Sequence, residues 1–486
     1  MAIPFTQIPA ALLVPGQYQE VDPSLAGSTG EIKKVLIIAC KSDAGTAPAG
    51  KPVRVLSELK AAALFGYGSP AAILAKIFLE LNKSEECWVL PAAAPGAATA
   101  WRKTFTVTAV SAQQGAVAIT VNGVKIDAAA IAAGASAEEA AAAIVARINS
   151  EVWLPVEAEA GEGGVFTVVS VAAGTGGNHN TVTIGSEAAG LTVTEGAVSA
   201  GTQTAAVKPL FAALGNTRYH YFIYDFSDTA NIAALGEELV SRYGALRQIG
   251  GRAFVALSGE LGGVSEAGTA LARADVVNNP HIVLVPRLSS PQLPGEWAAR
   301  WCAAACRILA NDPAANTCDL AVPGLAGGEI DADTRQVMLA AGIATYRLDA
   351  SGNVLIERLV TSYTENTDGG RDTSYLDIQV PETVDAVRTY INAEARQRYK
   401  TWKLASTEEN FGSGAKVMTA GIFRSFLCEL YQAVFIKEKR WCQDFDAYKS
   451  SLIVEVKKGS KTWLEYLHQP NLIGQFYIGA GLLQFK

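Results

Sequence analysis

Strands and helices alternate along the middle of this 486-residue chain, and this alternation restricts the possible folds more than any other feature. Three short apolar runs have the length and bounds of buried strands, and each precedes a helical pattern. The pairs are 219–224 with 229–243, 253–257 with 264–274, and 281–285 with 294–309. This repeated order predicts a parallel sheet covered by helices.

The apolar run at 33–40 (KKVLIIAC) is expected to join the same sheet, although residues 101–205 interrupt the pattern. The interrupting stretch is rich in Thr, Val, Gly and Ala. Asn122-Gly123 is a strong hairpin signal, and Ser136 with Glu139 forms a capping box at the start of a helix. We therefore interpret 101–205 as a small domain inserted into a larger one.

The predicted fold class is α/β and multidomain, with an α/β core built on a mostly parallel sheet, an inserted α+β (β-rich) domain, an α+β C-terminal domain and extended terminal arms. In the last third we expect a hairpin over 343–363, helices at 381–400 and 416–439, and strands at 451–457, 463–467 and 472–485. The proposed parts are an N-terminal arm at 1–30, a core at 31–100 and 206–342, the insertion at 101–205, the C-terminal domain at 343–470 and a C-terminal strand arm at 471–486.

Composition excludes several functional classes. A net charge of −7 gives no electrostatic surface for nucleic acid, so no nucleic acid partner is expected. The seven cysteines are odd in number and have no zinc-site spacing, which favours reduced thiols packed in cores. We expect no signal peptide and no membrane insertion, because no apolar run approaches the roughly 20 residues that span a bilayer.

Three patterns resemble a nucleotide-binding, a metal-binding and a catalytic site, but each lacks a residue that such a site needs. Residues 45–52 have P-loop glycine and lysine spacing, but Pro52 stands where the magnesium-binding hydroxyl is needed. Cys302 and Cys306 lie four apart on a helix and would need a third ligand, so core packing is favoured. Asp225 and Asp228 follow a strand, where α/β sites often lie, but either acid could instead cap the next helix. We assign no catalytic, cofactor-binding or metal-binding residue and no cofactor.

Motifs spread along the chain closely resemble Mu-like contractile bacteriophage tail sheath proteins. The N-terminal match is Phe5-Thr-Gln-Ile8-Pro9 followed by Val14-Pro15-Gly16-x-Tyr18-x-Glu20-Val21-Asp22. Further matches are Pro52-Val-Arg-Val-x-Ser57, Leu64-Phe65-Gly66-x-Gly68-Ser69, Gly174-x3-Asn178-x-Asn180, Gly370-Arg371-Asp372 to Tyr375-Leu376-Asp377, the helix after Pro381, and Arg424. Their order and spacing are specific, whereas no single motif is diagnostic.

The resemblance implies a virion structural protein, not an enzyme. It implies a helical homo-oligomer that surrounds a tail tube protein, meets baseplate and tail terminator proteins, and contracts to drive the tube through the host envelope for virus ejection. Assembly is expected in the bacterial host cytoplasm, from a phage or prophage, and the product in the virion tail. The alternatives are another self-assembling tail, baseplate or contractile-injection component, or a cytosolic α/β enzyme with an inserted domain.

The two ends of the chain are the predicted contact points between subunits. Prolines prevent residues 1–30 from forming a continuous helix, so this apolar segment needs a surface to lie on. The resemblance implies strand exchange, in which the arms of neighbouring subunits add strands to one another's sheets. The predicted anchors of the arms are Ile3, Phe5, Ile8, Leu12, Tyr18, Phe476, Ile478, Leu482 and Phe485.

Overall fold

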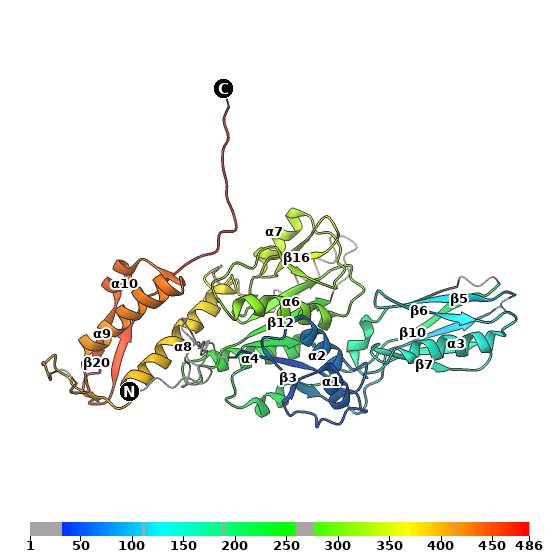
Figure 1. The fold of residues 1–486 in the computed structure, drawn as a ribbon, viewed down its shortest axis with the longest axis horizontal. Helices are drawn as coiled ribbons and strands as arrows, with labels where there is room; N and C mark the ends of the chain where they lie inside the picture. The colour runs from blue at the N-terminus through cyan, green and yellow to red at the C-terminus, as the bar shows by residue number, and fades with distance from the viewer. Residues whose placement is uncertain (1–31, 109–111, 187–189, 259–276, 413, 486) are drawn as a thin grey trace, which may run out of the picture. The chain divides into compact units, whose positions relative to one another are not determined.

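The computed structural model describes residues 32–108, 112–186, 190–258, 277–412 and 414–485 (Figure 1). The predicted N-terminal arm and the predicted helix at 264–274 lie outside these residues. Contacts divide the chain into Met1–Ile32 and Lys33–Lys486, and only the second unit is considered below. Within the described residues, no helix combines the length and apolar character that a membrane span requires.

A six-stranded sheet carries the largest hydrophobic core, and its strands come from distant parts of the sequence. Its order is β13 (Ile282–Arg287), β12 (Arg252–Ser258), β11 (Tyr221–Tyr224), β1 (Lys34–Cys40), β3 (Glu86–Ala92) and β2 (Val53–Val55). All neighbours are parallel except β2 and β3. The predicted mostly parallel sheet is therefore present, and β1 pairs with β11 across the interrupting stretch.

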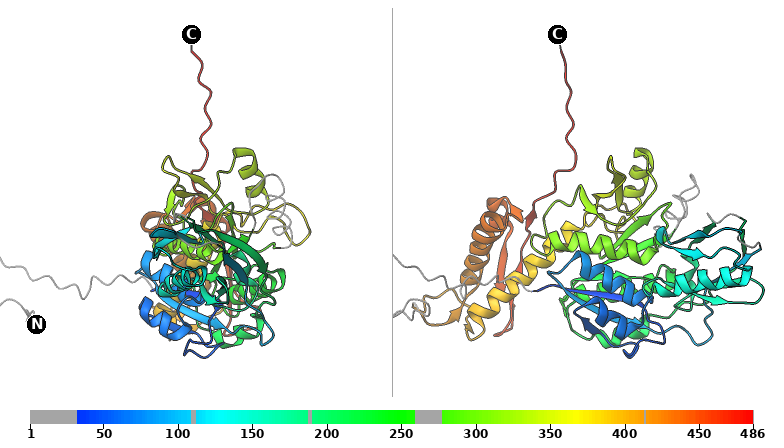
Figure 2. Two further views of the ribbon diagram at one scale, coloured as in Figure 1. Left: turned by 90° about the vertical axis from the view of Figure 1, so that its right-hand side faces the viewer. Right: turned by 45° about the vertical axis from the view of Figure 1, so that its right-hand side comes forward.

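Helices with clear start signals cover this sheet. They are α1 (Glu58–Phe65), α2 (Pro70–Leu81), α4 (Thr229–Tyr243) and α6 (Pro294–Leu309). Ser57 and Ser69 each accept a hydrogen bond from a main-chain N–H of the first turn of α1 and α2. α2 and α6 pack against each other (Figures 1 and 2). Trp297 and Trp301 of α6 are fully buried in the core beneath.

The interrupting stretch has its own hydrophobic cluster, which includes Phe105, Ile119, Ile144 and Phe166. Its strands are β4 (Arg102–Val107), β5 (Gly115–Val121), β6 (Val124–Ile131), β7 (Val156–Ala160), β8 (Val165–Ser170), β9 (Val182–Ser186) and β10 (Val193–Ser199), with helix α3 (Ala137–Ser150). The strands form two antiparallel sheets, ordered β10-β4-β8-β7 and β6-β5-β9. The hairpin at Asn122-Gly123 and the capping box at Ser136 and Glu139 are both present. The boundary of this region as a domain stays a prediction.

The last third is a mixture of short sheets and helices. Its elements are β14 (Leu320–Val322), α7 (Ala332–Ala340), β15 (Thr345–Leu348), β16 (Val354–Arg358), α8 (Gln379–Tyr399), β17 (Lys403–Leu404), β18 (Val417–Met418), α9 (Ala420–Glu429), the π-helix η4 (Leu430–Glu438), β19 (Cys442–Gln443), α10 (Phe445–Ser451), β20 (Ile453–Val456), β21 (Leu464–Leu467) and β22 (Asn471–Leu472). The predicted strand at 472–485 is wrong for the single chain, because pairing ends at Leu472. A strand needs a hydrogen-bonded neighbour, and among the described residues none lies beside 473–485.

Candidate assembly site

The enzyme-like patterns in the sequence do not assemble into a catalytic site. The loop at 45–52 leads into strand β2, whereas a P-loop leads into a helix N-terminus. Cys302 and Cys306 are fully buried in the main core, as the packing interpretation predicts. Among the described residues, no group of three or more His, Cys, Asp and Glu side chains is arranged to hold a metal ion.

The two acids after β11 have different environments. Asp228 is the N-cap of α4, and its carboxylate accepts a hydrogen bond of 3.0 Å from the main-chain N–H of Asn231. Asp225 does not cap the helix, and it lines a cavity instead. The prediction that one of these acids caps the next helix is therefore confirmed for Asp228 and not for Asp225.

Two-stranded sheets in the last third leave main-chain groups available at their edges. In the part of the chain that the structure describes, β20 and β21 pair only with each other, in the register Ile453↔Leu467 to Val456↔Leu464. Ile453, Trp463 and Leu467 each expose just over half of their surface. Phe423 of α9 supports this sheet from one side, with its ring 5.3 Å from that of Tyr466. Such a pair is marginal alone, and each outer edge could accept a further strand.

Among the described residues, the hydrogen bonds that hold the C-terminal segment to the rest of the chain are made by residues 473–477. The main-chain N–H of Ile473 donates to the carbonyl of Trp441 at 3.0 Å, and Gln475 donates through its side chain to the carbonyl of Ala314 at 2.9 Å. Tyr477 is the last anchor, since its hydroxyl accepts a hydrogen bond of 3.1 Å from Gln379. The guanidinium of Arg358 lies 4.8 Å from the centre of the Tyr477 ring. Burial raises the pKa of Tyr477 to about 12, so this phenol is neutral.

Beyond Tyr477 the chain runs extended and away from the other elements (Figure 1). Ile478 is 78% exposed, Leu482 86% and Phe485 94%, and Phe476 just before the anchor is 82% exposed. In an extended chain, alternate residues share a face, so Phe476, Ile478 and Leu482 lie on one face and Phe485 on the other. Residues 473–485 carry no charged side chain. Contiguous exposed apolar side chains of this kind often mark sites of interaction with another protein.

The structure describes the predicted arm residues at the C-terminus but not those at the N-terminus. The four C-terminal anchors are exposed along one segment and do not come together, while Ile3, Phe5, Ile8, Leu12 and Tyr18 lie outside the described residues. Sequence reasoning missed Tyr477 with its partners Arg358 and Gln379, which fix where the free segment begins. No local pattern could have revealed this contact, because it joins residues about a hundred positions apart. The roles of all these residues stay predictions.

Comparison with known proteins finds similarity to phage tail sheath proteins. Residues 196–362 match the phage tail sheath protein central domain. The Mu-like prophage FluMu tail sheath protein of Haemophilus influenzae (strain ATCC 51907 / DSM 11121 / KW20 / Rd) is 29% identical over 498 residues, covering 100% of each chain. Solved structures that the chain matches include the sheath tail protein of Desulfitobacterium hafniense (13% identity, TM-score 0.48, covering 95% of this chain and 100% of that one). Another is the sheath tail protein of Listeria innocua (15% identity, TM-score 0.44, 91% and 96% coverage).

The central-domain match begins in β10 and ends just after β16, so it includes β11, β12 and β13 of the six-stranded sheet. The full-length relative extends the similarity to both termini. The predicted resemblance is therefore confirmed: residues 196–362 match the phage tail sheath protein central domain, and the whole chain is similar to a Mu-like prophage tail sheath protein.

Proposed function

We propose that this chain is the structural subunit of a contractile phage tail sheath. It polymerises as a helical tube around an inner tail tube and contracts to drive that tube through the host envelope. Its partners are other copies of itself, the tail tube protein, and the baseplate and tail terminator proteins. It assembles in the cytoplasm of the bacterial host and then forms part of the virion tail.

One observation carries the proposal: an uncharged, exposed C-terminal segment and a two-stranded sheet with open edges occur in the same chain. A segment from one copy that pairs with a sheet of the next copy makes a head-to-tail contact, and repetition of that contact builds a helix. The match to the tail sheath central domain supports the same interpretation. Residues 1–20 are proposed to act as a second arm.

The energies available at such a junction are sufficient for assembly. Each main-chain hydrogen bond contributes roughly 0.5–1.5 kcal/mol, and each large apolar side chain that becomes buried contributes about 1.5–3 kcal/mol. Contraction then needs no nucleotide, because two packings of the lattice differ in free energy. A difference of roughly a few kcal/mol per subunit is large when a cooperative tube changes as a whole.

Deletion of residues 478–486 tests the proposal. The cut leaves the anchors at Ile473, Gln475 and Tyr477 in place, so the thermal unfolding of the subunit should not change. Polymerisation should fail, as measured by sedimentation and by electron microscopy of the purified protein. Hollow, wide polymers of the full-length chain would support a sheath, and closed rings would favour another tail or baseplate component.

Matched substitutions separate the role of the apolar anchors from a general effect of sequence change. Ile478→Ser and Leu482→Ser remove apolar side chains, and Gln484→Ser is the control because it removes only a polar one. We expect the first two to weaken polymerisation and the control to leave it intact. A truncated chain that still forms full-length tubes would contradict strand exchange through this segment.

A further inference from the structure

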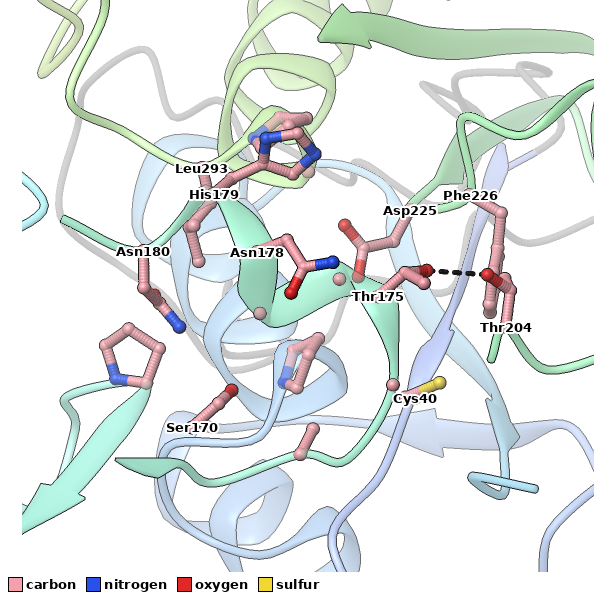
Figure 3. A pocket seen from close by; sticks show the side chains of 18 of the residues that line it. Cys40, Ser170, Thr175, Asn178, His179, Asn180, Thr204, Asp225, Phe226 and Leu293 are labelled. Atoms are coloured by element: carbon pink, nitrogen blue, oxygen red, sulfur yellow. Dashed lines mark hydrogen bonds between the residues drawn. The ribbon is translucent and has the colours of Figure 1, made fainter. Parts of the chain in front are cut away.

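A cavity of about 380 Å³ lies where the parallel strands end, and nothing in the proposed assembly uses it (Figure 3). Its floor is formed by Cys40 at the end of β1 and by Asp225 just after β11. These two strands are neighbours, and β1 is followed in space by β3 on its other side. The crevice outside the carboxyl ends of strands at such a reversal of order is where α/β proteins commonly bind ligands.

The other walls come from three separate elements. The turn η2 (Thr175–His179) closes one side, the N-terminal turn of α6 closes another, and Ile73 and Leu74 of α2 make the wall apolar. Cavities that bind small molecules have volumes of roughly 300–1,000 Å³, apolar walls and a few converging polar groups. This cavity has the volume and the apolar walls of a small-molecule site, so its polar groups determine which kind of molecule it would bind.

Asp225 and Glu296 place two carboxyl groups at this cavity. Among the described residues, no donor forms a hydrogen bond with the side chain of Asp225. The Asp225 carboxyl packs directly on Gly295 at the start of α6, where a Cβ atom would come within 2.1 Å of its Oδ1. No lysine or arginine is among the residues that line the cavity. Asp225 therefore lacks a matching side-chain cation inside the cavity, whereas Arg300 and Arg287, outside the lining, partly offset the charge of Glu296.

Asn180 supplies an independent sign of a missing ligand. Its side chain is 6% exposed, and its Oδ1 accepts a hydrogen bond of 2.9 Å from Asn122. Its Nδ2 has no hydrogen-bond partner and points toward the cavity (Figure 3). A buried amide donor without a partner costs roughly 1–3 kcal/mol, so an acceptor atom on a bound molecule would recover this energy.

We propose that the cavity binds a small organic amine, whose ammonium group lies on the carboxyls of Asp225 and Glu296 and whose acceptor atom takes the free hydrogen bond of Asn180. The apolar walls favour an organic cation over a bare metal ion, because they cannot supply the oxygen ligands that a metal ion needs. The inference does not depend on assembly and concerns the subunit itself.

The ionisation of the cavity supports this assignment. Burial, together with the nearby charge of Glu296, raises the pKa of Asp225 to about 7, so ionisation is incomplete at neutral pH unless a cation is present. The other titratable groups that line the cavity are Cys40, His179 and Asp228. Burial and Asp225 raise the pKa of Cys40 to about 12, so that thiol is neutral. Binding of an amine should therefore weaken as the pH falls below about 7.

The test uses three probes of one shape on the full-length subunit: tyramine is cationic, tyrosol is neutral and hydroxyphenylacetate is anionic. We expect saturable binding of tyramine alone by calorimetry, weakened at least about tenfold by Asp225→Asn or Glu296→Gln. Asn180→Ala should weaken it less. Asp333→Asn, an exposed acid on α7, is the matched control and should have no effect.

Asp225→Asn keeps the shape of the side chain and removes a charge that burial penalises, so the variant should unfold at no lower temperature than the wild type. Glu296→Gln provides a second variant on a different element. Equal binding of all three probes, no binding of tyramine, tyramine binding that survives both substitutions, or displacement of tyramine by Mg²⁺ or Ca²⁺ at equal concentration would each overturn the proposal.

Discussion

Removal of the charge of Asp385 should destabilise the subunit more than any surface substitution, because this carboxylate joins α8 to the six-stranded sheet region. Its side chain is 7% exposed and pairs with two arginines, Arg218 before β11 and Arg388 on α8, the latter at 2.5 Å. One turn earlier, Glu382 lies 3.4 Å from the fully buried Arg252 of β12. The five charges form one network, in which Asp385 and Arg252 are buried and Arg218, Glu382 and Arg388 are partly buried.

Removing the charge of Asp385 leaves the guanidinium groups of Arg218 and Arg388 without this partner in a poorly solvated place. We expect Asp385→Asn to lower the free energy of unfolding by about 3–5 kcal/mol. The matched control is Glu394→Gln on the same helix, whose pair with Arg398 at 2.8 Å is partly exposed. An exposed pair contributes only about 0.2–1 kcal/mol, so the control should remain close to wild type. Urea unfolding followed by fluorescence measures both.

The pH dependence gives a second measurement with a definite sign. Burial opposes ionisation of Asp385, but Arg218, Arg252 and Arg388 outweigh it and lower the pKa below the ordinary value of 3.8. The network therefore stabilises the fold fully above that ordinary value and is lost as the pH falls through the lower folded pKa. The difference between wild type and Asp385→Asn should shrink in this acid range. A loss below about 1 kcal/mol at neutral pH, or a difference that does not change in acid, would refute the reasoning.

Two further predictions concern the other features. Replacement of 101–205 by a short Gly/Ser linker should leave a folded, soluble subunit, because the two ends of this region lie side by side. The hydroxyls of Thr99 and Thr202 form a hydrogen bond of 2.9 Å there. Aggregation of the shortened chain in sedimentation would show that the region is part of the core. ATP with magnesium should give no saturable heat in calorimetry, since the loop at 45–52 has Pro52 in place of the magnesium-binding hydroxyl after Lys51 and leads into a strand instead of a helix. Micromolar binding that Lys51→Ala abolishes would contradict this prediction.

Local signals predicted the elements that carry them. The predicted helices at 229–243 and 294–309 agree with α4 and α6 at both ends, because Asp228 caps the first and Pro294 occupies the first turn of the second. The hairpin at Asn122-Gly123 is equally local. The short strands β7 and β9 were missed, since their sequences VEAEA and VTIGS carry little apolar signal.

Features that depend on distant contacts could not be predicted from local pattern. The apolar pattern at 472–485 is that of a strand, but a strand forms only where a partner offers hydrogen bonds. The cavity is a similar case. The sequence indicated acids at the end of a strand, yet Asp225, Asn180 and Glu296 come from three segments that only the fold brings to one place.

The edges of the sheets indicate where an arm from another copy can add a strand. The edge strand β2 of the large sheet is only three residues long, runs antiparallel to β3, and carries Arg54, which pairs with Glu86 at 3.0 Å. At the opposite edge, Leu284 of β13 forms a parallel bridge with Ile343. A short charged edge and a covered edge both oppose the addition of another strand. β20 and β21 each carry one glutamate, Glu455 and Glu465, but among the described residues no further strand covers their outer edges, and residues 478–485 carry no charged side chain to repel a partner. We therefore expect the arms of neighbouring copies to add strands to the small sheets of the C-terminal third and not to the large sheet.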